Sequence, residues 1–276
     1  MELLRQGPPV AKTAEGPEPC PGRWVLRSLR ESLGAVKHYT LSGVWYYLKR
    51  ARVSWRAAYL RQWSPDPEYQ SKLEQLLVCL REAGQAPGAI ELIFMDEAGF
   101  YRWPTPAKTW AQDPPASPPC AYHAGNWNNA QWRIIGGLNA CTGQVNYLCN
   151  YIVGRQQLIA WYQQLHHTYP HATRIYVVQD NWSIHTHPDV LQALQQYPRI
   201  QTVWLPTYSS WLNPIEKLWR WLKVEILKMH RLAQDWNLLK HQVSLFLDQF
   251  AGGDRQLLQY VGLLGEGKLA QALRCQ

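Results

Sequence analysis

RIYVVQDNWSIHTHPDVLQALQQYPRIQTVWLPTYSSWLNPIEKLWRWLK, residues 174–223, is the stretch that decides the fold. Two short apolar runs, Ile175 to Val178 and Ile200 to Leu205, enclose a helical pattern, which is typical of neighbouring strands joined by a crossover helix. Asp180 follows the first run, where open α/β sheets place their ligands. Glu216 lies in the first turn of the helix that follows the second run. The stretch therefore predicts an α/β domain with these two acids close to one edge of its sheet.

The length of 276 residues suits one large domain plus a small one. The 15 tryptophans indicate a packed core. No apolar run approaches the ~18 residues that a membrane helix needs, and the start has no apolar signal-peptide segment. The six cysteines form no CxxC pair, so neither a zinc site nor a disulfide framework is indicated. These features predict a cytoplasmic protein without membrane contact.

The positive charge is concentrated near the start of the chain. Residues 1–64 hold 11 Lys/Arg against 4 Asp/Glu, whereas the remainder of the chain, which has a net charge of +8 as a whole, is nearly neutral. A basic first quarter indicates a small nucleic-acid-binding module attached to a catalytic or structural body. The alternative is a solvated basic surface with no partner.

The first quarter contains two short helical patterns. Residues 1–22 are rich in Pro and Gly and are expected to be disordered. A helix is predicted from Arg23 to a stop at Gly34, and Thr40 or Ser42 can cap a second one with Val44, Tyr47 and Leu48 on its apolar side. Residues 23–64 therefore resemble a helix-turn-helix plus linker, although paired amphipathic helices are common. The predicted DNA contacts are Lys37, Lys49, Arg50 and Arg52.

Residues 65–276 read as one further domain with a helical tail. Asp66 and Pro67 are predicted to begin a helix, and an apolar strand is predicted to end at Asp96. Residues 102–130 look like a long loop. The predicted helices are Glu68–Ala83, Gln156–His167, Trp236–Phe250 and Asp254–Leu264, the helix carrying Glu216 is expected to reach about His230, and the predicted strands are Ile90–Met95, Trp132–Leu138 and Val145–Val153.

Three acids, Asp96, Asp180 and Glu216, fall at the predicted ends of sheet elements. Because side chains alternate along a strand, Asp96 and Glu97 are not expected to point into the same site. Carboxylates suit Mg²⁺ or Mn²⁺, and two such ions ~4 Å apart serve phosphodiester chemistry. No histidine or cysteine has suitable spacing for a further ligand. Each acid also has a structural interpretation: Glu216 with Asn213 as a helix cap, Asp180 in a turn, Asp96 at a strand end.

Three blocks carry a family resemblance. MDEAGF, VVQDNWSIH and LPTYSSWLNPIEKLWRWLK resemble, in this order, the catalytic blocks of insertion-sequence transposases of the mariner-like superfamily. The resemblance implies a ribonuclease-H-like fold, in which a mixed five-stranded sheet is flanked by helices, behind a small all-α helix-turn-helix segment. It implies that Asp96, Asp180 and Glu216 are catalytic and bind Mg²⁺ or Mn²⁺, with two ions. It also implies a homodimer that binds double-stranded DNA, namely the terminal inverted repeats of the element and its target site. Association with the nucleoid is implied as well.

The same blocks point to further residues around the acids. Asn181 and His185 match the second block, and they are expected either to support the acids or to contact nucleic acid. The alternative for His185 is a histidine that caps a helix or lies in the core. Trp219 and Trp221 are expected to be core. The remaining candidates for this surrounding role are Asn213, Lys217, Arg220 and Lys223, of which the three bases either contact phosphate or form a solvated stripe.

The family pattern is not complete in this chain. Such transposases usually begin with two helix-turn-helix units, and here only the second is recognisable, which indicates a truncated DNA-binding region. Three functions remain open on the sequence. The first is a transposase that cuts and transfers the strands of its own element. The second is a catalytically inactive DNA-binding remnant. The third is a ribonuclease-H-like nuclease that acts on other nucleic acid.

Overall fold

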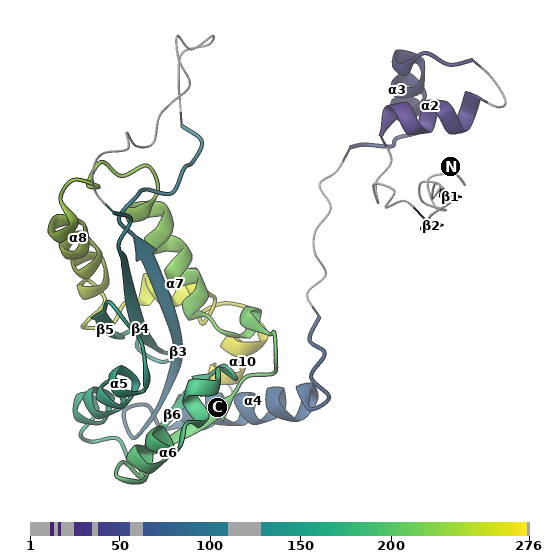
Figure 1. The fold of residues 1–276 in the computed structure, drawn as a ribbon. Coiled ribbons are helices and arrows are strands. Elements are labelled where there is room, and N and C mark those ends of the chain that lie inside the picture. The colour runs from purple at the N-terminus through teal and green to yellow at the C-terminus, as the bar shows by residue number, and fades with distance from the viewer. Residues whose placement is uncertain are drawn as a thin grey trace. The chain divides into compact units, whose positions relative to one another are not determined.

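The computed structural model describes residues 12–13, 16–17, 25–34, 38–55, 63–109 and 128–274. It divides the chain into two compact units, Met1–Arg61 and Gln62–Gln276 (Figure 1). Within residues 1–22, Lys12–Thr13 (β1) and Gly16–Pro17 (β2) pair as an antiparallel ladder. The remaining residues of that segment, Lys37 and the centre of the predicted loop 102–130 lie outside the described residues.

The smaller unit contains two packed helices, α2 (Leu26–Gly34) and α3 (Leu41–Arg50). The Thr40 hydroxyl accepts a hydrogen bond from the Gly43 amide at 3.0 Å and so caps α3, as its sequence predicts. Leu29 and Val44 are buried between the helices. Tyr47, which was expected on the apolar side, is instead exposed, and its ring packs edge-on against Tyr39 and Tyr46.

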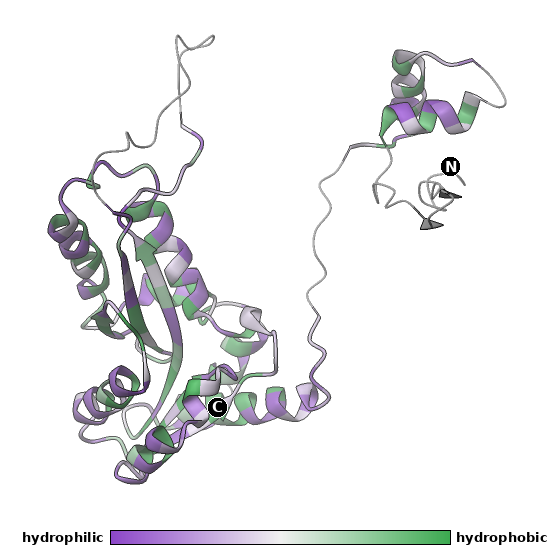
Figure 2. Ribbon diagram, in the orientation of Figure 1, coloured by the Kyte–Doolittle hydropathy of each residue, from purple (hydrophilic) through white to green (hydrophobic). Residues whose placement is uncertain are grey.

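The larger unit is built on a five-stranded sheet in the order β5-β4-β3-β6-β7. Strand β4 pairs antiparallel with both β5 and β3, whereas β6 pairs parallel with both β3 and β7. The sheet is therefore mixed, which confirms the predicted fold class. Hydrophobic residues concentrate in these strands (Figure 2). The strands are β3 (Ile90–Tyr101), β4 (Gln131–Asn139), β5 (Val145–Asn150), β6 (Arg174–Gln179) and β7 (Ile200–Trp204).

Helices cover both faces of the sheet because alternate strand residues are apolar on both sides. Ile93 and Met95 of β3 pack with α5 (Arg155–Thr168) and α6 (Pro188–Gln195). Leu92 and Phe94 point the other way, into the larger core cluster. That second layer contains α4 (Tyr69–Gln85), α7 (Ile215–Leu222), α8 (Trp236–Asp248), α9 (Arg255–Val261) and α10 (Lys268–Arg274).

Strand β3 is longer than its sequence predicts, since it continues past Met95 to Tyr101. Its parallel pairing with β6 ends at Phe94, but its antiparallel pairing with β4 continues to Tyr101. Asp96 is therefore not at the end of a strand. It lies in the middle of β3, just beyond the end of β6, where one side of the strand is free of a sheet neighbour.

The helix that carries Glu216 is shorter than predicted. The α-helix α7 ends at Leu222 and passes into a π-helical segment, η3 (Lys223–Leu227), rather than reaching about His230. The chain turns away there because Thr105 pairs with residues 227–229: its amide donates to Leu227 O and its carbonyl accepts from Met229 N, both at 3.1 Å. Among the described residues, no helix is long and apolar enough to cross a membrane.

Candidate active site

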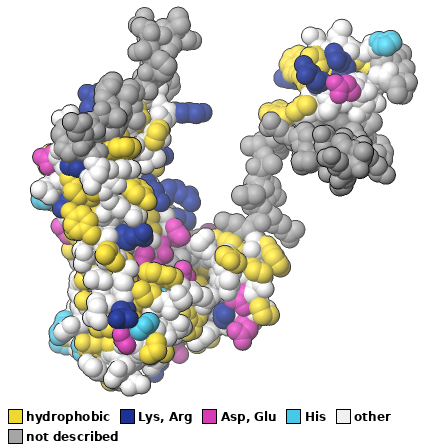
Figure 3. Space-filling view, in the orientation of Figure 1, with side chains coloured by type: hydrophobic (Ala, Val, Ile, Leu, Met, Phe, Trp, Pro, Cys, Tyr) yellow, Lys and Arg dark blue, Asp and Glu magenta, His cyan; other side chains and the backbone are white. Residues whose placement is uncertain are grey.

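The three predicted acids line one cleft of about 530 Å³ in the larger unit. Asp96 enters it from the middle of β3, Asp180 from the residue after β6, and Glu216 from the first turn of α7. The structure thus brings together residues that are far apart in sequence. On the visible face of this unit, acidic side chains gather near the middle, with basic side chains close by (Figure 3).

Asp96 is positioned by a tryptophan on the neighbouring helix. Trp219 of α7 is buried and its indole Nε1 donates to Asp96 Oδ2 at 3.0 Å. The ring fits there because Gly136 of β4 stands opposite Asp96 and has no side chain. A Cβ at Gly136 would lie 2.4 Å from the Trp219 ring. Trp219 is therefore a core residue, as the sequence predicts, and also a hydrogen-bond donor to the site, which the sequence does not reveal.

The cleft concentrates negative charge. Burial, and then the charges of Glu216 and Asp180, raise the pKa of Asp96 to about 7. No Lys or Arg is among the described residues that line this cleft. Buried like charges without a neighbouring cation hold a proton or require a bound cation. The donor set therefore fits a divalent metal ion, which carboxylate oxygens suit.

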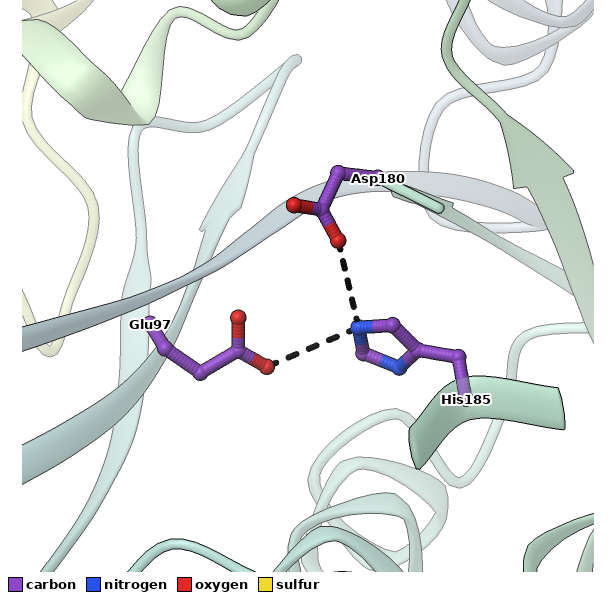
Figure 4. A group of neighbouring side chains, drawn as sticks. All are labelled: Glu97, Asp180 and His185. Carbon is purple, nitrogen blue, oxygen red and sulfur yellow. Dashed lines mark ion pairs between the residues drawn. The ribbon is translucent and has the colours of Figure 1, made fainter. Parts of the chain in front are cut away.

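A histidine joins Asp180 to a fourth acid, Glu97 (Figure 4). His185, on the 3-10 helix η1 (Ser183–Thr186), is buried, and its Nε2 lies 3.5 Å from Asp180 Oδ1 and 3.6 Å from Glu97 Oε1. His185 lowers the pKa of Asp180, whereas burial, followed by the charges of Asp96 and Asp180, raises the pKa of Glu97 to about 8. One ligand atom from each of the three residues falls within 4.8 Å of the others.

This group corrects one expectation from the sequence and agrees with another. A histidine does lie close enough to an acid to share a metal ion with it, because η1 follows β6 and brings His185 Nε2 within 3.5 Å of Asp180 Oδ1. Asp96 and Glu97 do alternate, since Asp96 lines the cleft and Glu97 contacts the buried histidine. Asp180 nevertheless acts on both, because its charge helps to raise the pKa of Asp96 and the pKa of Glu97.

Asn213 does not cap α7, contrary to the prediction. Pro214 precedes the helix, no side chain caps it, and Asn213 Nδ2 donates to Met95 O at 2.9 Å instead. Asn213 therefore attaches the start of α7 to β3 directly beside Asp96. The exposed Glu216 side chain lines the cleft rather than closing a capping box.

Asn181 supports the part of the cleft wall that follows β7. Its Nδ2 donates to Leu205 O at 3.1 Å and to Thr207 Oγ1 at 3.2 Å, so it holds the segment that follows β7. Asp66 holds the same segment from the other side, since its Oδ2 accepts from the Thr207 amide at 2.8 Å. Asp66 accepts from the Glu68 amide as well, but α4 begins only at Tyr69, so it is not the N-cap that the sequence predicts.

The predicted basic residues of α7 divide between two roles. A second cleft adjoins the first at Glu216 and is lined by Lys217, Arg220 and Lys268. Lys217 Nζ donates to Val261 O at 2.8 Å, so this ammonium group attaches α7 to α9. Arg220 and, beyond the end of α7, Lys223 are exposed.

In the smaller unit, the predicted DNA contacts Lys49, Arg50 and Arg52 are exposed. They share the surface of α3 with aromatic rings, because Trp45 and Tyr46 are also more than half exposed. Lys49 Nζ lies 5.1 Å from the centroid of the Trp45 ring. This surface is thus both basic and aromatic.

Sequence reasoning missed four residues of the larger site. The acidic pair Asp96–Glu97 was a visible signal for Glu97, but alternation along the strand argued against it. Asp66 and Trp219 had no local signal, because their contacts are with residues more than a hundred positions away. Tyr208, which lines the cleft, had none because its backbone geometry is set by the folded structure.

Comparison with known proteins agrees with this geometry. A family model described as DDE superfamily endonuclease matches residues 91–240, more than half of the chain. A curated relative, the insertion element IS630 uncharacterized 39 kDa protein of Shigella sonnei, is 30% identical over 132 residues, which are 47% of this chain and 38% of the relative. The chain thus matches well under two thirds of that relative's length.

Solved structures of the Mos1 mariner transposase are similar in fold. The paired end complex with Mn matches 91% of this chain and 72% of its own chain, with a TM-score of 0.64 and 16% sequence identity. A pre-cleavage Mos1 transpososome matches 92% of this chain and 79% of its own, with a TM-score of 0.56 and 16% identity. These likenesses support the ribonuclease-H-like architecture of the larger unit.

Proposed function

Because the chain belongs to the family of DDE superfamily endonucleases, we propose that it is a transposase that cuts and transfers DNA strands of its own element with the help of divalent metal ions. The observation that carries this proposal is the convergence of Asp96, Asp180 and Glu216 on one cleft. The likeness in fold to Mos1 and the relationship to an insertion-element protein support it.

The metals of this proposal are Mg²⁺ or Mn²⁺, with Asp96, Asp180 and Glu216 as the residues that would hold two ions. Their fit rests on the crowded carboxylates, whose mutual repulsion helps to raise the pKa of Asp96 to about 7. When bound, such ions would activate the attacking oxygen and stabilise the leaving oxygen of a phosphodiester.

The surrounding residues orient the acids in this scheme. Trp219 fixes one oxygen of Asp96, and the backbone amide of Trp182 donates to Asp180 Oδ1 at 3.0 Å. His185 lies against the same Asp180 oxygen and is buried, so we assign it to support of the acid and not to DNA contact. Holding catalytic groups rigidly is what positions a reacting phosphate correctly.

Double-stranded DNA is the proposed partner, through two surfaces. The basic cleft of Arg220 and Lys268 adjoins the acids at Glu216 and suits the phosphates that flank the cutting point. The exposed Lys49, Arg50 and Arg52 of the smaller unit suit recognition of terminal inverted repeats. The Mos1 neighbours are paired-end complexes, and we extend to this chain a homodimer that pairs two DNA ends. A cytoplasmic, nucleoid-associated protein agrees with such a role.

The test is a gel assay with the full chain and DNA that carries the ends of its element, with and without Mg²⁺. We expect nicking at the ends that requires Mg²⁺ and that falls at least about a hundredfold in Glu216→Gln, because the lost carboxylate weakens the metal site. Glu225→Gln, an exposed acid in the following π-helical segment, is the matched control and should keep full activity.

Other outcomes separate the remaining functions. Binding of the ends without cutting under any metal condition would identify an inactive remnant. Cutting that ignores the end sequence would identify a ribonuclease-H-like nuclease. Full activity of Glu216→Gln would contradict the proposed site.

A further inference from the structure

Tyr208 is an exposed aromatic residue with strained backbone at the wall of the acidic cleft. Its side chain is 80% exposed, yet it lines the same cleft as Asp96, Asp180 and Glu216. Its φ of 55° is in the left-handed region, which a bulky residue rarely adopts. An exposed ring gains little from packing, so nothing that the ring itself contacts in this unit compensates for the strain.

The neighbours of Tyr208 impose its conformation. Thr207 is held through its amide and hydroxyl by Asp66 Oδ2, at 2.8 and 3.3 Å, and through its hydroxyl by Asn181. Ser209 is buried and its hydroxyl donates to Pro206 O. Strain that the surroundings maintain, at a site of chemistry, indicates a function for the residue that bears it. The fixed neighbours hold the backbone of Tyr208 in place at the cleft that it lines.

A second ring lies in the same cleft. Trp182 is 38% exposed, and its indole packs edge-on against the buried His185 with ring centroids 5.8 Å apart. Its amide holds Asp180, so the ring is attached to the site through both backbone and side chain. The cleft therefore offers two aromatic rings beside the acids.

We propose that Tyr208 stacks on an unpaired base of the nucleotide next to the phosphate that is cut, with Trp182 as the second face. The inference rests on the proposed function and specifies how its substrate is held. Every base has a π-face, so stacking on an aromatic ring holds a strand without reading its sequence. The occupant is a nucleotide because the rings share their cleft with the acids, and this cleft adjoins the basic cleft of Arg220 and Lys268 at Glu216.

The test combines two variants of Tyr208 with DNA that lacks single bases. Tyr208→Phe keeps the ring, whereas Tyr208→Asn removes it and tolerates the left-handed backbone. On intact DNA ends we expect Tyr208→Asn to bind about 5- to 150-fold more weakly, the range for one lost stacking contact, and Tyr208→Phe to resemble wild type. On a duplex whose stacked base has been removed, wild type and Tyr208→Asn should bind alike.

A fluorescence titration provides a readout without cleavage. The probe is the same DNA end with 2-aminopurine next to the cutting point, added to chains that also carry Asp180→Asn. Stacking should quench the probe with Tyr208 or Phe at position 208 but not with Asn. Tyr151→Asn, which removes an exposed ring outside the cleft, is the matched control and should leave quenching unchanged.

The outcomes distinguish this inference from the function on which it rests. Equal losses for Tyr208→Phe and Tyr208→Asn, or a loss that persists unchanged for every missing base, would overturn stacking while leaving the transposase proposal intact. Weakened self-association of Tyr208→Asn with unchanged quenching would instead assign the ring to a protein interface. Wild type that quenches the probe but never cuts DNA would refute the proposed function and retain the stacking contact.

Discussion

Asp96 shows most directly how one residue combines structure and chemistry. It lies mid-strand between Glu216 and Asp180, and one of its oxygens is fixed by Trp219. Burial and like charge keep its pKa near 7, well above the ordinary 3.8. Such a carboxyl is costly to ionise until a cation neutralises the cleft, so metal affinity and protein stability are linked at this residue.

This linkage predicts the pH dependence of stability without metal. Because the pKa of Asp96 is raised in the folded chain, the folded state binds the extra proton between pH 3.8 and about 7. Stability from this group is therefore complete below pH 3.8 and is lost as the pH rises to about 7. In EDTA we expect Asp96→Asn to melt higher than wild type at pH 8, and by a smaller margin at pH 5, by circular dichroism.

Magnesium supplies the control for that comparison. Adding Mg²⁺ at pH 8 should raise the melting temperature of wild type and not that of Asp96→Asn, because the variant lacks the charge that the ion neutralises. An Asp96→Asn variant that melts lower than wild type at pH 8 in EDTA would show that the carboxyl is not strained by its neighbours.

Gly136 is a second residue at which one added atom, a Cβ, is expected to affect the site. An added Cβ would lie 2.4 Å from the buried Trp219 ring and displace the donor that holds Asp96. We expect Gly136→Ala to lower the free energy of unfolding by about 1–3 kcal/mol in urea titrations, through overpacking. It should also reduce cutting of DNA ends.

The comparison residue is Gly252, where an added Cβ meets nothing within 4 Å. Gly252→Ala should change the free energy of unfolding by no more than about 0.5 kcal/mol. Equal stability of the two alanine variants would mean that the Trp219 ring moves aside without cost.

At the scale of elements, the segment after β7 is fixed from both sides of the cleft. Lys72, and then the Thr207 amide, hold the pKa of Asp66 well below its usual range. Stability from this acid is present above its ordinary pKa of 3.8 and is lost as the pH falls through and below that value. The bonded acid thus locks the start of α4 to the wall of the cleft.

Loss of that lock should appear locally. We expect Asp66→Asn to accelerate hydrogen exchange of the Thr207 amide at pH 7, because its charged acceptor becomes neutral and loses Lys72. Glu68→Gln is the control, since Glu68 is exposed and also pairs with Lys72. Equal protection of Thr207 in the two variants would remove Asp66 from the support of the cleft.

Helix α3 carries a prediction of its own. Its exposed Lys49 and Arg50 suit phosphate contacts, each of which releases counterions from DNA. We expect Lys49→Gln combined with Arg50→Gln to reduce the slope of log K against log salt by about 1.8 in filter-binding titrations. Arg81→Gln, an exposed base on α4, should leave the slope unchanged; an unchanged slope in the α3 variant would place DNA elsewhere.

At the scale of the whole molecule, we expect folding and DNA recognition to be separable. The larger unit, residues 62–276, contains the whole sheet, its helices and the three acids. We expect this fragment to melt cooperatively within a few degrees of the larger transition of the full chain. It should bind DNA but lose its preference for terminal repeats over unrelated duplexes in gel-shift competition. A preference that survives would assign recognition to the larger unit.

The sequence by itself determined the type and order of the main elements of the larger unit. Apolar runs identified β6 and β7, and the predicted strands Trp132–Leu138 and Val145–Val153 correspond to β4 and β5. The resemblance identified Asp96, Asp180 and Glu216 together. These features are readable because periodicity and turn chemistry act over a few neighbouring residues.

Only the tertiary structure decided which side chains meet and in what state. The continuation of β3 past Asp96 depends on the pairing of β4, and the contact of His185 with Glu97 depends on where η1 returns. The lock between Asp66 and Thr207 joins residues 141 positions apart. Such contacts come from packing between distant segments, and burial among them sets each charge, so no local pattern in the chain contains them.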